Sequence, residues 1–146
     1  MSSIEETQQS IIDEFAGIGD WQDRYRKIIA MGKELPEIDE KYKLDENLIK
    51  GCQNRVWLHA ELQDDGTVLY LADSEAMIVR GFVALLVRSY SGHTPDAILE
   101  TSPRFIEELN LGENISLNRA NGLASMVKQI KLYAMAFKAL QAKMKS

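Results

Sequence analysis

The chain has 146 residues, of which 45% are apolar and 27% charged, a balance typical of one globular domain and not of a disordered chain. Its net charge of −5 argues against binding to nucleic acid, which requires clustered positive charge. The single cysteine, Cys52, excludes an internal disulfide, and the longest apolar run, residues 81–87, is too short to span a membrane. We therefore expect one domain over residues 1–146, soluble and cytoplasmic, since the polar N-terminus MSSIEETQQS also lacks the features of a secretion signal.

Two amphipathic helices are predicted in the N-terminal part of the chain. Ser3 and Glu6 form a capping-box pattern, apolar residues then recur at helical spacing, and Gly17 indicates the end of this helix. A second helix is predicted from Asp20 until just before Pro36, again with its apolar residues on one face. Both helices should pack against a larger body.

A β-hairpin is the clearest strand signal in the sequence. Residues 56–62 alternate between apolar and polar, Asp65-Gly66 favours a tight turn, and residues 68–72 provide the returning strand. Because an isolated hairpin is only marginally stable in water, we expect a third strand from the irregular region 36–50.

The remainder of the chain is predicted to be helical. Asp73 or Ser74 can cap a helix whose sequence AMIVRGFVALLV is apolar nearly all round, which is typical of a buried central helix. Thr94-Pro95 and Ser102-Pro103 each place a capping residue before a proline and predict two short helices, and the last and longest helix begins at Ser116. This order predicts an α+β fold: a small antiparallel, three-stranded sheet with helices packed on one side.

Most recognisable catalytic and binding motifs are absent from the sequence. It has no glycine-rich phosphate loop, no dinucleotide-binding pattern and no nucleophile elbow. The two histidines, His59 and His93, do not have the spacing of metal ligands relative to one another. We therefore expect neither a metal nor a cofactor on this chain.

The surroundings of Cys52 favour two opposite interpretations. The residue follows Gly51, which permits a positive φ, and Lys50 and Arg55 could stabilise a thiolate by their charge. Free cysteines are nevertheless among the most buried residue types and often only fill space. The residues alone leave a reactive and a structural thiol both open.

A single reactive cysteine restricts the possible chemistry. A cysteine hydrolase needs a base, which could only be His59 or His93 here, and a dithiol redox enzyme needs a second cysteine. An iron–sulfur scaffold needs several ligands. One thiol is sufficient to accept a group from another protein and to pass it on.

Four stretches together resemble a known family. They are IKGCQNRVWL at 49–58, ADSEAMIVRG at 72–81, Thr94-Pro95 and LNRANGLASMV at 117–127. With these motifs the chain resembles the SufE family of sulfur-acceptor proteins from about residue 10 to residue 140. The resemblance implies an antiparallel sheet similar to that of IscU-type scaffolds.

The resemblance also implies a function in sulfur transfer. A PLP-dependent cysteine desulfurase of the SufS or CsdA type would be the partner, and the PLP would belong to that partner. Cys52 would take sulfur from the desulfurase persulfide and deliver it towards iron–sulfur cluster assembly, to a scaffold or another sulfur acceptor. The chain would also activate the desulfurase by clearing its persulfide, and it would act with that enzyme and not as a stand-alone enzyme.

The same resemblance suggests supporting residues. Gly51 and Gln53 belong to the cysteine motif and would shape its loop, and Arg119 matches the arginine at the start of the family's last helix. Arg119 would lie near the loop, steadying an anionic sulfur or contacting the desulfurase; the alternative is a solvated residue at a helix N-terminus. Members of the family tuck this loop over an apolar cavity when free. The alternative function is a non-catalytic adaptor that binds a partner enzyme, with Cys52 structural.

Overall fold

The computed structural model describes residues 2–145 and confirms the α+β fold. The elements are α1 (Ile4–Ala16), α2 (Trp21–Glu34), η1 (Glu40–Tyr42), η2 (Asp45–Asn47), β1 (Val56–Leu62), β2 (Val68–Ser74), α3 (Met77–Tyr90), α4 (Pro95–Glu100), α5 (Arg104–Glu108), α6 (Leu111–Asn114) and α7 (Leu117–Lys145). The predicted caps at Ser3 and Thr94 are confirmed, and so is the predicted helix start at Asp20, because each of these side chains accepts a hydrogen bond from a backbone N–H in the first turn of its helix. Among residues 2–145, no helix is long and apolar enough to cross a membrane.

The sheet of the described residues is a two-stranded hairpin, which corrects the expected strand count. β1 and β2 are antiparallel, with Val56 opposite Ser74 and Leu62 opposite Val68. From the region 36–50 only Leu48 forms a bridge, to Trp57. The third strand stays this short because η2 ends immediately before Leu48 and the chain turns again at Gly51, which has a φ of 91°.

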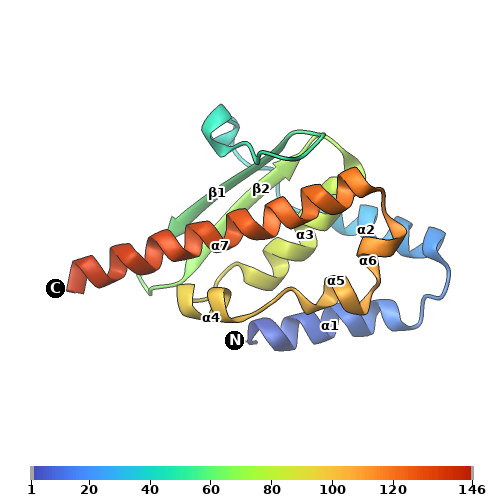
Figure 1. Ribbon diagram of the computed structural model, residues 1–146, viewed down its shortest axis with the longest axis horizontal. Coiled ribbons are helices and arrows are strands. Elements are labelled where there is room, and N and C mark those ends of the chain that lie inside the picture. Colours follow the sequence, from blue (N-terminus) through green and yellow to red (C-terminus); the bar gives the residue numbers. More distant parts are fainter. Residues whose placement is uncertain (1, 146) are drawn as a thin grey trace.

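The helices pack on one face of the hairpin, as predicted. Residues such as Leu58 and Tyr70 point into a core that they share with α3 and α7. In Figure 1, α7 runs across the hairpin, and α3 lies between the strands and the N-terminal helices. On the other face, Tyr42 from the segment before β1 stacks on His59 with ring centroids 4.2 Å apart.

Two predicted caps are corrected. Asp73 and Ser74 do not cap α3, because they are the last residues of β2 and α3 begins only at Met77. The Asp73 carboxylate is buried and lies 3.3 Å from the Arg80 guanidinium and 3.5 Å from the Lys43 ammonium, so its function is to pair these cations. At the start of α5 the capping position is occupied by Pro103 and not by Ser102, whose carbonyl is used elsewhere.

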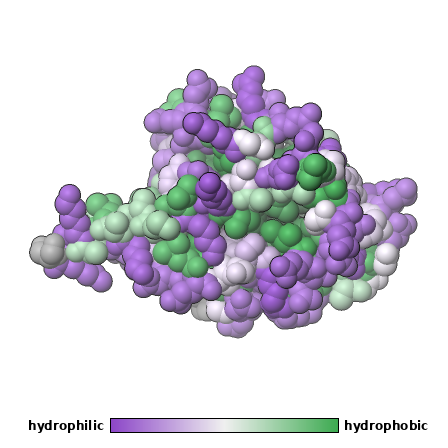
Figure 2. Space-filling model, viewed as in Figure 1, coloured by the Kyte–Doolittle hydropathy of each residue, from purple (hydrophilic) through white to green (hydrophobic). Residues whose placement is uncertain are grey.

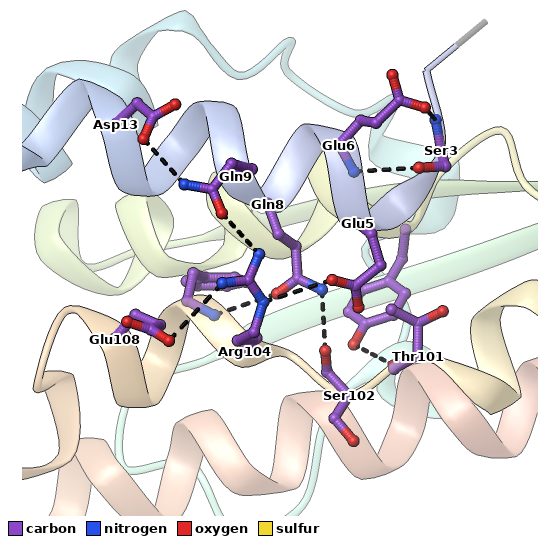
Figure 3. A network of polar contacts seen from close by, with 12 residues as sticks. Ser3, Glu5, Glu6, Gln8, Gln9, Asp13, Thr101, Ser102, Arg104 and Glu108 are labelled. Atoms are coloured by element: carbon purple, nitrogen blue, oxygen red, sulfur yellow. Dashed lines mark hydrogen bonds and ion pairs between the residues drawn. The ribbon is translucent and has the colours of Figure 1, made fainter.

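A buried amide joins α1 to the entrance of α5 (Figure 3). Gln8 is fully buried, and its side chain donates to the Ser102 carbonyl at 2.9 Å and accepts from the Phe105 N–H at 3.1 Å. Arg104 adds exposed contacts to Glu5 and Gln9 on the same helix. Because both polar ends of the Gln8 amide are satisfied, burial costs little and the contact fixes the connection that leads to α7.

Candidate functional site

The site is built from the loop between Leu48 and β1, which lies along the first part of α7. The loop and α7 run in opposite directions there. Gly51 lies against Ser125, Cys52 against Gly122, and the Gln53 side chain accepts a hydrogen bond of 3.4 Å from Asn118. The beginning of α7 is therefore the surface on which the cysteine is held.

Glycine is required at position 51 for two reasons. Its φ of 91° is a conformation that side chains with a Cβ rarely adopt. A Cβ at this position would also lie 2.6 Å from Ser125 Oγ, well inside contact distance. Gly51 thus allows the loop both to turn and to approach the helix.

Gly122 is a site residue that the sequence analysis missed. A Cβ at position 122 would lie 3.3 Å from Cys52 Sγ and 3.8 Å from Cys52 Cα, so the thiol occupies the space of the missing side chain. A glycine inside a helix costs about 0.5–1 kcal/mol relative to alanine. A glycine inside a helix usually has a packing or functional reason, and this was the signal in the sequence that could have revealed Gly122.

The Cys52 thiol is half-buried in a small pocket. Its S–H donates to the Gly122 carbonyl oxygen over an Sγ–O distance of 3.6 Å. Val79, Phe82 and Met126, all buried, provide the apolar part of the lining, and about 20 Å³ of space remains free. Burial raises the pKa of the Cys52 thiol, so this position of the loop, which we call closed, holds the thiol in the protonated form.

The expectation that Lys50 and Arg55 stabilise a thiolate is wrong for this arrangement. Arg55 is exposed and its Nε lies 2.9 Å from a carboxylate oxygen of Glu75, which already compensates its charge. Lys50 is exposed and lines a neighbouring groove instead of the thiol pocket. Desolvation is the cause of the raised pKa of Cys52, and neither cation contributes to that shift.

Arg119 lines the same pocket as Cys52 and Gln53. Its guanidinium donates to the Tyr25 hydroxyl at 2.7 Å, and its backbone N–H donates to Ser116 Oγ at 3.2 Å. The structure thus brings all four residues singled out from the sequence to one place and adds Tyr25 from α2. Tyr25 could not be found from the sequence because α2 and α7 lie far apart in the chain.

The two histidines lie away from the thiol. His59 Nε2 is 3.1 Å from Glu61 Oε1, and the His93 carbonyl accepts from the Val68 N–H. Neither residue lines the pocket of Cys52, so the base that a cysteine hydrolase needs is not beside the thiol. Within residues 2–145, no three His, Cys, Asp or Glu side chains are grouped as metal ligands would be.

Comparisons with known proteins identify the family. The family model SufE, described as an Fe-S metabolism associated domain, matches residues 9–134. The chain belongs to the SufE family. A SufE-like protein of Rhizobium etli is 41% identical over 125 residues, which are 83% of this chain and 84% of that protein. The sulfur acceptor protein CsdE of Escherichia coli is 34% identical over 125 residues, 85% of each chain.

A solved structure shares the fold of this chain. The solution structure of a hypothetical protein from Thermus thermophilus superposes with a TM-score of 0.75, covering 91% of this chain and 96% of that one. The two sequences are 20% identical, so this similarity concerns the fold alone.

Proposed function

We propose that this protein accepts sulfur from a PLP-dependent cysteine desulfurase of the SufS or CsdA type, and that Cys52 carries the sulfur. The observation that carries the proposal is the position of the cysteine. Cys52 lies in a loop whose side chains make only two long polar contacts with α7, of 3.6 Å and 3.4 Å, beside a small free space and the cationic Arg119. Membership of a family that includes a named sulfur acceptor supports this use of the thiol.

The transfer is a thiol exchange at the outer sulfur of the desulfurase persulfide. The Cys52 thiolate attacks that sulfur, a new S–S bond forms on Cys52, and the bond between the two sulfurs of the desulfurase breaks. The desulfurase cysteine leaves as a thiolate and takes up the proton released by Cys52. No electrons are gained or lost overall, because one persulfide replaces another.

The reaction requires the loop to leave its closed position. In the pocket the thiol is protonated, and the attacking species has to be the thiolate. Because the closed loop depends on weak polar contacts and on the small residues Gly51 and Gly122, docking of a partner can displace it at modest cost. Release of the loop into water both lowers the pKa of Cys52 and exposes its sulfur to the partner.

The closed position also suits the product. About 20 Å³ is free beside Cys52, and a water-sized sphere needs roughly 10–15 Å³ of the same measure. The terminal sulfur of a persulfide could therefore be sheltered there, next to Val79 and Phe82. Arg119 in the same wall would offer its positive charge to a persulfide anion.

The function is tested by incubating the protein with a PLP-loaded desulfurase and free cysteine and by measuring its intact mass. One added sulfur is expected, lost on reduction and absent in Cys52→Ser. An unmodified wild-type protein, or an adduct that persists in Cys52→Ser, would contradict the proposal.

The burial of the thiol favours one alternative, a non-catalytic adaptor with a structural Cys52. The adaptor would stimulate the desulfurase equally well as wild type and as Cys52→Ser. Sulfur transfer instead predicts that Cys52→Ser binds the desulfurase but no longer accelerates its turnover.

A further inference from the structure

A groove lies beside the cysteine loop, between residues 46–50 and α7. Its volume is about 400 Å³. The wall on α7 consists of Ser125, Lys128, Gln129, Leu132 and Tyr133. Gly51, packed against Ser125, separates this groove from the pocket of Cys52. Whatever enters the groove therefore touches the segment that carries the cysteine.

The end of the groove nearest the cysteine is basic. Lys50 and Lys128 are both exposed, and neither takes part in an ion pair among residues 2–145. The one carboxylate of the groove, Glu46, lies towards the other end, where its charge adds to burial in raising the pKa of Tyr133. In a chain with a net charge of −5, two uncompensated lysines at the same groove favour an acidic ligand.

The opposite end of the groove continues into an exposed apolar row on α7. Leu132 is 44% exposed and Met135, three residues further on, 56%; Leu140 and Met144, four residues apart, are 45% and 72% exposed nearer the end of the helix. Tyr133 and Gln141, on another side of the helix, contact the hairpin, so the row is not used internally. This end of α7 projects beyond the hairpin in Figure 1 and shows apolar surface in Figure 2. Apolar residues next to a charged groove are typical of a protein-docking surface.

We propose that this groove and Leu132 bind a segment of the desulfurase that carries acidic residues and, next to them, an apolar side chain. Its carboxylates contact Lys50 and Lys128, and its apolar side chain packs on Leu132. The inference rests on the proposed function and specifies how the partner is recognised. Because Lys50 and Gly51 adjoin Cys52 in the chain, occupation of the groove acts directly on the loop that has to open.

The experiment measures the protein concentration that gives half-maximal stimulation of a purified desulfurase, using the SufS- or CsdA-type enzyme with which the wild type gains sulfur on Cys52. Lys50→Glu/Lys128→Glu should raise this concentration about tenfold, since attraction becomes repulsion at two positions. Added salt should weaken stimulation by the wild type and not by this variant. Leu132→Asp should raise the concentration several-fold.

Lys33→Glu is the matched control, because Lys33 is exposed on α2, lies outside the groove and takes part in no ion pair of residues 2–145. It changes the net charge in the same direction and should leave the half-maximal concentration within about twofold. Equal values for wild type and for Lys50→Glu/Lys128→Glu, at equal thermal stability, would overturn the groove proposal. The groove proposal would also be overturned if Lys50→Glu/Lys128→Glu changed only the self-association measured by sedimentation, because the groove would then bind a second copy of this protein. A wild type that never gains sulfur would instead overturn the proposed function.

Discussion

Replacing Gly122 with alanine tests how the cysteine loop is held. The new Cβ would lie 3.3 Å from Cys52 Sγ, closer than most real contacts of this kind, so either the loop or the sulfur has to move. Overpacking of this type costs about 1–3 kcal/mol. Destabilising the closed loop by that amount shifts the ratio of open to closed molecules by about 5- to 150-fold. The helix itself should gain about 1 kcal/mol, because alanine favours helix over glycine.

The assay is the rate at which iodoacetamide alkylates Cys52 as a function of pH. Gly122→Ala should react about 5- to 150-fold faster at neutral pH. The pH profile of its alkylation rate should move to lower pH because the thiol is less buried. Thermal stability should be unchanged or lower by no more than about 2 kcal/mol, because the helix gain of about 1 kcal/mol offsets part of the overpacking cost. Gly112→Ala is the control, since a Cβ there meets nothing within 4 Å. An unchanged rate and profile in Gly122→Ala would refute the account of how the loop is held.

The remaining predictions concern the pH dependence of the loop, a buried carboxylate and Arg119. Because burial raises the pKa of Cys52 above its unfolded value, the closed loop has its full stability below the ordinary thiol pKa and loses it as pH rises through the raised one. Hydrogen exchange of the loop should therefore accelerate at alkaline pH beyond the intrinsic rate, and Cys52→Ala should abolish that excess. Asp73→Asn removes the carboxylate shared by two partly buried cations and should cost about 1–3 kcal/mol in urea unfolding, whereas Glu75→Gln, in an exposed pair, should cost less than about 1 kcal/mol. Arg119→Ala should lower the yield of persulfide on Cys52 several-fold in the mass assay, and Tyr25→Phe, which keeps the guanidinium, should lower it less.

Much of the fold could be predicted because its signals are local. The caps at Ser3 and Thr94, the helix start at Asp20 and the alternation over residues 56–62 each depend on neighbours in sequence, and the structure confirms them. The third strand failed because a 3-10 turn and the positive φ of Gly51 interrupt the pairing after Leu48. Local propensity could not show that interruption.

The site was less accessible to sequence reasoning because its contacts are long-range. Seventy residues separate Cys52 from its hydrogen-bond acceptor Gly122. Whether Lys50 and Arg55 reach the sulfur depends on how the loop lies on α7, and the loop turns both cations outward. The placement of Arg119 beside the loop came from the family resemblance, since no pattern within the sequence indicates it.

A single-turnover experiment tests the central claim most directly. A desulfurase is charged with its persulfide, freed of excess cysteine, mixed with this protein, and quenched with an alkylating reagent before peptide mass analysis. The account predicts that one sulfur leaves the desulfurase and appears on the peptide that contains Cys52. Sulfur that stays on the desulfurase, or leaves it without any gain on Cys52, would contradict the account.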